Sequence, residues 1–225
     1  MMVRGILITA VILAVLAGVV GYLMIRWAEA PVLSEADHPP EKIVVIPEGA
    51  TFNQAATLLE REQLIRSRSA FLLLGKSQEA DRKIHPGEYA LHAAMPPAEI
   101  LSKFLAGRVV LHPVTIPEGY AMSQIADVLE EHHITNRKEF LRLASDKSFV
   151  KSLGVDADSV EGYLYPDTYH FARPTAAKDV IKAMVDQLDH VMTQELKVRA
   201  KEINLTVHQV LTLASVIEKE TGAGN

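Results

Sequence analysis

Hydrophobic and polar positions divide this 225-residue chain into three parts. Residues 5–25 are apolar throughout and carry no charge, whereas residues 43–188 alternate short β-type runs with amphipathic helical stretches. Residues 206–222 have the periodicity of one amphipathic helix, which begins at a capping-box spacing and ends at a glycine. The pattern predicts an apolar helix followed by an α+β part that ends in a helix.

The apolar segment 5–25 is long enough, at about 1.5 Å per residue, to cross a hydrocarbon core of about 30 Å. We expect a cytoplasmic tail at 1–4, a transmembrane helix at 5–25 and a spacer at 26–42. This arrangement predicts a single-pass membrane protein whose remaining residues lie outside the cytoplasm. A cleaved signal peptide is the alternative, because 28–30 has a small-x-small form, but an apolar stretch of this length favours an uncleaved anchor.

An internal duplication fills the middle of the chain. The sequence Ile-Pro-Glu-Gly at 46–49 recurs at 116–119, and flanking positions recur at the same offset of 70 residues. We expect two units, 43–106 and 107–188, of which the second has an insertion near 149–162. Each has the order strand, Pro-Glu-Gly turn, two helices, return strand and closing helix, which is a β-α-α-β-α plan of the α+β class.

A carboxylate stands on the apolar stripe of the last helix. Five apolar residues form this stripe, and Glu218 lies within about 20° of its first member. The stripe comprises Val207, Val210, Leu211, Ala214 and Ile217. A charged carboxylate is costly on a core-facing stripe, so Glu218 should pair with a cation or stay protonated, as a general acid must. A snorkelling or salt-bridged Glu is the ordinary alternative.

Three of the six tyrosines fall within residues 161–169, which read EGYLYPDTY. In an extended strand Tyr163 and Tyr165 would share a face and offer two rings of the kind on which sugars stack. Ordinary packing explains tyrosines in a strand equally well.

Composition narrows the function classes. The net charge is −5 and the Lys and Arg residues are scattered, so we expect no nucleic-acid partner. The nine His form no ligand set of recognisable spacing, and we expect no metal and no cofactor. The absence of Cys suits an exported protein that folds without disulfides.

Two motifs carry a resemblance to a known family. Residues 213–221 (LASVIEKET) closely resemble the signature of the YceG-like family, the endolytic murein transglycosylases, in which the Glu matching Glu218 is catalytic. Residues 161–169 resemble the family's EGYLFPDTY motif, with Tyr165 in place of Phe, and the family places this motif beside the cleft. The start of each unit also looks like a LysM module, a glycan-binding fold, although a plain structural repeat is the alternative.

The resemblance implies a membrane-anchored lytic transglycosylase, a carbon–oxygen lyase, in the bacterial inner (plasma) membrane with its soluble part in the periplasm. It would cleave the β-1,4 bond between N-acetylmuramic acid and N-acetylglucosamine in nascent peptidoglycan, leave 1,6-anhydro ends and so terminate strand elongation. Glu218 would be the catalytic residue. Substrate-binding residues implied by motif position are Glu161, Tyr163, Tyr165, Asp167, Tyr169, Ser215, Glu220 and Thr221. The implied partners are peptidoglycan glycan strands, the membrane through residues 5–25 and, as candidates, peptidoglycan synthases.

The resemblance has one departure. The chain stops three residues after Gly222, whereas family members continue and complete the cleft, so we expect 189–225 to be the start of a helical, lysozyme-like catalytic part. The main alternative function is a non-catalytic, membrane-anchored adaptor that binds peptidoglycan. A third is a scaffold that recognises division or elongation proteins through its acidic face.

Overall fold

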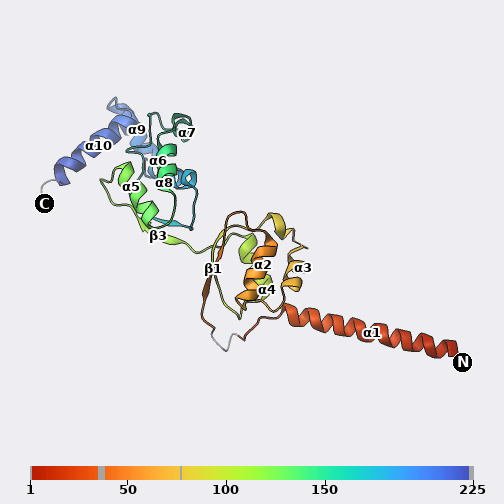
Figure 1. Cartoon of the computed structure of the whole chain (residues 1–225). Coiled ribbons are helices and arrows are strands. Elements are labelled where there is room, and N and C mark those ends of the chain that lie inside the picture. Colours follow the sequence, from red (N-terminus) through yellow and green to blue (C-terminus); the bar gives the residue numbers. More distant parts are fainter. Residues whose placement is uncertain (1, 35–38, 77, 223–225) are drawn as a thin grey trace. The chain divides into compact units, whose positions relative to one another are not determined.

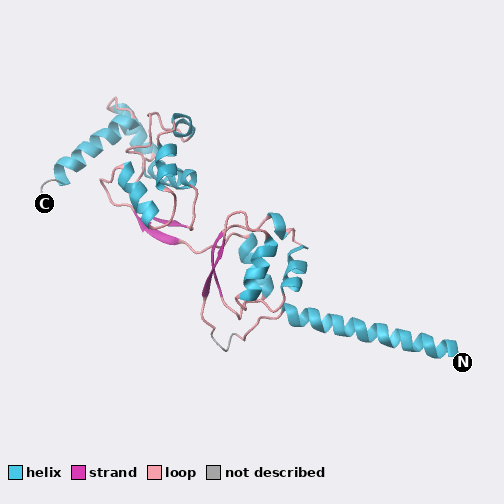
Figure 2. Ribbon diagram, in the orientation of Figure 1, coloured by secondary structure: helices cyan, strands magenta, loops and turns pink. Residues whose placement is uncertain are grey.

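The computed structural model describes residues 2–34, 39–76 and 78–222, except for the side chains of 2–11, 14, 25, 82, 219, 221 and 222. The chain divides into two compact units, Met1–Val110 and Leu111–Asn225 (Figure 1). Each unit combines one pair of antiparallel strands with several helices (Figure 2), so the described residues are α+β, as the sequence predicts.

In its described residues the first unit has a two-stranded sheet and four α-helices. Its elements are α1 (Met2–Glu29), β1 (Lys42–Ile46), α2 (Phe52–Arg61), α3 (Arg68–Lys76), the 3₁₀ helix η2 (Ala80–Arg82), β2 (Gly87–Leu91) and α4 (Pro97–Leu105). Strand β1 pairs antiparallel with β2, and Val44 lies opposite Tyr89. Helix α2 begins at a capping box in which Thr51 and Gln54 each satisfy the other's backbone N–H. Its apolar face, which includes Leu59, is buried in the core of this unit.

The second unit repeats this plan and extends it. Its elements are β3 (His112–Thr115), α5 (Met122–Glu131), α6 (Arg137–Ala144), α7 (Lys147–Ser152), β4 (Thr168–Phe171), α8 (Ala177–Val191), α9 (Gln194–Glu202) and α10 (Val207–Gly222). Strand β3 pairs antiparallel with β4, and Val114 lies opposite Tyr169. Helix α7 falls in the stretch where the second repeat is longer than the first.

The two units share details of packing as well as order. Tyr89 donates its hydroxyl hydrogen to the carbonyl of His85, and Tyr169 donates to the carbonyl of Tyr165, both over 2.7 Å. In each unit the tyrosine of the return strand is therefore hydrogen-bonded to the backbone carbonyl four residues before it. Buried apolar residues also correspond, for example Phe71 in the first unit and Phe140 in the second.

The predicted transmembrane helix at 5–25 is wrong, and so is the single-pass inner-membrane location that follows from it. Among the residues that the structure describes, no helix combines the length and the apolar character that crossing a bilayer requires.

Candidate functional site

The second unit contains a cavity of about 940 Å³, lined by three segments that are distant in sequence. The first is the Pro-Glu-Gly turn with the start of α5, the second is the loop 161–166, and the third is α10. Leu188 of α8 also contributes. Five of the nine site residues that the sequence predicts line this cavity: Glu161, Tyr163, Tyr165, Ser215 and Glu218.

The other predicted site residues lie elsewhere. Asp167 and Tyr169 support the loop from the side of the sheet, and Glu220 is exposed on α10 without lining the cavity. The side chain of Thr221 lies outside the described residues. Sequence reasoning missed Tyr120 and His208, which line the cavity at its turn and on α10.

Helix α10 begins as the sequence predicts. The Thr206 N–H donates to the Gln209 side chain over 2.8 Å, and the Gln209 N–H donates to the Thr206 hydroxyl over 3.2 Å, which completes the capping box. Only the first part of the apolar stripe is covered: Leu211 packs on the core and is half-buried, whereas Ile217 is 53% exposed. The cover over the stripe therefore ends before Glu218.

Glu218 is exposed and lies against the Pro-Glu-Gly turn. A Cβ atom placed on Gly119 would be 3.4 Å from its Oε1 atom. Gly119 has φ of +74°, a conformation that glycine adopts far more easily than other residues. The turn of the second repeat thus approaches the carboxylate closely, and solvent reaches the carboxylate from its open side.

Tyr163 is not in a strand, and the predicted pair of rings on one strand face is wrong. Residues 161–163 form a turn in which the Tyr163 N–H donates to the Val160 carbonyl over 2.9 Å, and Gly162 has φ of +78°. Pro166 has no N–H to donate to a ladder, and β4 begins only at Thr168. Tyr163 is 7% exposed, so it offers little open ring surface.

The Tyr163 hydroxyl points to α10. Its oxygen lies 2.9 Å from Nδ1 of His208, and the two rings stack with centroids 6.0 Å apart and planes at 15°. Burial, with a smaller contribution from the charge of Asp156, raises the pKa of Tyr163. The hydroxyl therefore remains protonated and available for hydrogen bonding at neutral pH.

Tyr165 presents the more accessible ring of the loop. It is half-buried and lines the cavity, and its carbonyl accepts the hydrogen bond from Tyr169. Burial raises the pKa of Tyr169 far above its usual range, and the charges of Asp167 and Tyr165 add to this. Because the Tyr169 hydroxyl is hydrogen-bonded to the backbone of the loop at Tyr165, Tyr169 helps to fix the conformation of the loop.

The two acidic residues of the aromatic motif hold this loop in place. Glu161 accepts a hydrogen bond from the Met122 N–H, at 3.0 and 3.3 Å from its two oxygens, at the first turn of α5. A carboxylate at a helix N-terminus is stabilised by the helix dipole. Asp167 accepts from the side chain of Gln187 over 2.8 Å, while its carbonyl accepts from the Ile116 N–H over 2.9 Å.

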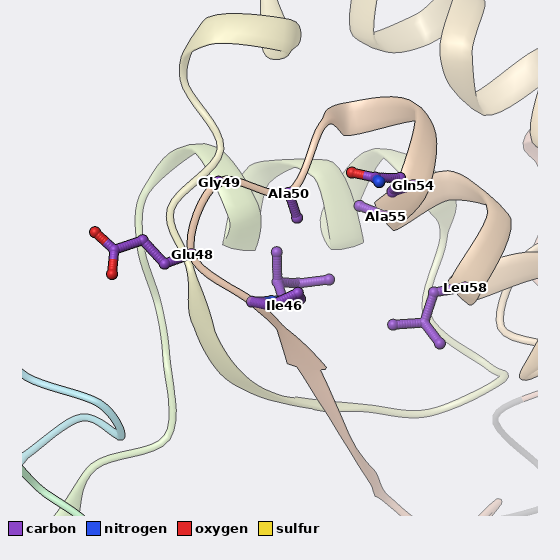
Figure 3. Close-up of a pocket in the computed structure, with 8 residues that line it drawn as sticks. Ile46, Glu48, Gly49, Ala50, Gln54, Ala55 and Leu58 are labelled. Atoms are coloured by element: carbon purple, nitrogen blue, oxygen red, sulfur yellow. The ribbon is translucent and has the colours of Figure 1, made fainter.

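A smaller hollow of about 340 Å³ lies at the corresponding turn of the first unit. Figure 3 shows Ile46, Ala55 and Leu58 around it, while the side chain of Glu48 points away from it. Its lining contains no aromatic ring and no acid on a facing helix. The hollow beside the turn therefore belongs to the repeated plan, and the tyrosines and the carboxylate are additions of the second unit.

The side chains of the larger cavity suit organic recognition better than metal binding. Across the described parts of the chain, no three His, Asp or Glu side chains are grouped so that they could hold a metal ion. Rings, hydroxyls and carboxylates around an open cavity are the groups with which proteins bind saccharides. Fold and site together define an α+β protein built from a repeated unit, with a cavity lined by rings, hydroxyls and carboxylates in its second unit.

The comparisons with known proteins identify the family. A model described as the YceG-like family matches residues 44–225, and the chain belongs to this family. It is 29% identical over 202 residues to the endolytic murein transglycosylase of Bacillus subtilis (strain 168), covering 83% of this chain and 56% of that protein. The protein of the same name from Streptococcus pneumoniae serotype 2 is 28% identical over 229 residues, covering 90% and 41%.

The chain spans about half the length of the curated relatives it matches. Among solved structures, a yceG-like protein from Listeria monocytogenes is 29% identical to it. That comparison covers 80% of this chain and 64% of the other, with a TM-score of 0.46.

Proposed function

We propose that this chain carries the catalytic acid and one wall of the substrate cleft of an endolytic murein transglycosylase. The observation that supports this most is that Glu218 and the loop 161–166 line one cavity, although more than 50 residues separate them in the sequence. The substrate class is peptidoglycan glycan, and peptidoglycan synthases are candidate protein partners. Cleavage within nascent strands would end their elongation.

The proposed reaction needs only one carboxyl group. Most glycosidases use two, one as acid and one as nucleophile or base. Here Glu218 donates its proton to the glycosidic oxygen as the bond between that oxygen and C1 of N-acetylmuramic acid breaks. The resulting carboxylate then takes the proton of the C6 hydroxyl of the same sugar, whose oxygen bonds to C1. The products are a free 4-hydroxyl on N-acetylglucosamine and a 1,6-anhydro end, and Glu218 regains its proton.

The surrounding residues have distinct proposed roles. Tyr165 offers a partly exposed ring on which a sugar can stack, and Ser215 presents its hydroxyl to the cavity while donating to the Thr212 carbonyl over 2.9 Å. Glu220 and Thr221 remain proposals from motif position alone. Bound glycan would displace water from the open side of Glu218.

A muropeptide digest tests the proposal. The full-length product of the gene, as wild type and as Glu218→Gln, is incubated with purified sacculi, and anhydro-ended products are measured by mass spectrometry. We expect release by the wild type and none by Glu218→Gln. Glu195→Gln is the matched control, because Glu195 is an exposed acid of the preceding helix α9 outside the cavity lining. Equal release by the wild type and Glu218→Gln would remove Glu218 from the mechanism.

The exposure of Glu218 favours one second candidate, a peptidoglycan-binding adaptor without activity. Exposure is the ordinary state of Glu side chains in proteins and is not by itself a mark of catalysis. Such an adaptor would be retained by sacculi in a pull-down and would release no product. Its Glu218→Gln variant would bind sacculi as well as the wild type does.

A further inference from the structure

We infer that His208 is a positioning residue for the site, acting through its contact with Tyr163; this inference rests on the function proposed above. His208 is in the first turn of α10 and lines the same cavity as Glu218. Its Nδ1 atom is 2.9 Å from the Tyr163 hydroxyl oxygen, and the two rings are stacked. The contact therefore joins the helix that carries the acid to the loop that carries the aromatic wall.

The packing of α10 explains why this contact matters. Its described side chains are exposed or half-buried; Val207, Val210 and Leu211 are half-buried, and Leu211 packs on the core of the unit. Apolar packing of half-buried side chains has no fixed direction, whereas a hydrogen bond with a stacked ring fixes direction as well as distance. Tyr163 is itself held in the core, so it is a firm partner.

Helix geometry gives the size of the effect. Ten residues at 1.5 Å each separate His208 from Glu218, a lever of about 15 Å. A tilt of about 10° around the His208 end would move the carboxyl group by about 3 Å. Displacements of ~1 Å at a catalytic group are enough to lower a rate about 100-fold. Loss of the contact should thus lower kcat while substrate affinity, which depends on the loop, changes less.

The hydrogen bond survives a change of charge on the imidazole. A neutral ring protonated on Nε2 accepts at Nδ1 from the tyrosine hydroxyl, and a protonated ring donates from Nδ1 to the tyrosine oxygen. Asn places a side-chain oxygen near the position of Nδ1, so it can restore the acceptor where Ala cannot. This makes His208→Asn a conservative replacement with a specific expected result.

Hydrogen exchange of the backbone amides tests the inference without any activity. We expect residues 207–218 to exchange about 2- to 10-fold faster in His208→Ala and in Tyr163→Phe, which is the loss of one hydrogen bond expressed as a rate. The double variant should be no faster than the singles, and His208→Asn should recover most of the protection. His190→Ala, which removes an exposed histidine of α8, is the control and should leave these amides unchanged.

Kinetics on sacculi with the full-length gene product supply the functional result. We expect His208→Ala to lower kcat at least about 10-fold with KM changed less than about 3-fold, and His208→Asn to recover activity. Additive exchange effects of His208→Ala and Tyr163→Phe, or full activity with a loosened α10, would overturn the inference. If instead the exchange results hold and Glu218→Gln is as active as the wild type, the proposed function fails while the contact stands.

Discussion

The two glycines of the Pro-Glu-Gly turns provide a test with an internal control. Gly49 and Gly119 have φ of +75° and +74°, so alanine at either position is strained to the same degree. The cost of an L-residue in this region is about 1–2 kcal/mol. We therefore expect Gly49→Ala and Gly119→Ala to lower the free energy of unfolding by similar amounts, as measured by urea denaturation.

The surroundings of the two positions differ. A Cβ on Gly49 meets nothing within 4 Å, whereas a Cβ on Gly119 lies 3.4 Å from Oε1 of Glu218. The added methyl group would occupy one side of that oxygen and exclude water or a substrate hydroxyl from it. Only Gly119→Ala should therefore affect chemistry, and a loss of about 1.4 kcal/mol in transition-state binding corresponds to a 10-fold lower kcat/KM.

The assay is release of anhydro-muropeptides by the full-length gene product at equal concentrations of folded protein. We expect Gly49→Ala to retain activity within about 2-fold and Gly119→Ala to lose about 10-fold. Equal activity of the two variants would refute the argument that the turn contacts the working acid. A much larger stability loss in Gly119→Ala than in Gly49→Ala would refute the premise of equal strain.

Three further predictions concern the supports of the site. Tyr89→Phe and Tyr169→Phe should each lower the free energy of unfolding by about 0.5–1.5 kcal/mol, because each removes one hydroxyl that donates a hydrogen bond over 2.7 Å. Tyr169→Phe should still be retained by sacculi in a pull-down. Loss of retention would show that Tyr169 contacts the glycan directly. Burial raises the pKa of Tyr89 to about 12. The protonated hydroxyl therefore stabilises the fold fully below pH 10, and this stabilisation is lost as pH rises from 10 to 12, at about 1.4 kcal/mol per pH unit. Urea denaturation at these pH values checks this, with Tyr89→Phe as the control whose stability should fall less. Glu161→Ala should destabilise the second unit by about 0.5–2 kcal/mol through loss of the bond to the Met122 N–H, and unchanged hydrogen exchange at the start of α5 would contradict this.

Features set by neighbouring residues were predictable from the sequence. The capping box at Thr206 and Gln209 forms because both partners lie within one turn of helix. The duplication predicted the return strands because a strand and its partner must repeat together. Val44 with Tyr89 and Val114 with Tyr169 are accordingly equivalent pairs.

Features set by distant residues were not predictable. Helical periodicity shows which side chains share a face, but not how much of that face is covered, so the stripe alone does not fix the exposure of Glu218. Tyrosine propensity favoured a strand at 163–165, but Gly162 at positive φ and Pro166 impose a turn. His208 was missed because its partner is 45 residues away, although it shares one side of α10 with Ser215.

The comparison of the two units indicates how the site is built. Both repeats have a turn with a glycine at positive φ and an apolar hollow beside it, so the hollow follows from the plan of the fold. The second unit differs in its loop 161–166, where Tyr165 takes the place of His85, and it adds α10 after the repeat ends. The loop and α10 meet in the contact between Tyr163 and His208. The groups proposed to do the chemistry of the second unit therefore come from a changed loop and an added helix, built on a plan that both units share.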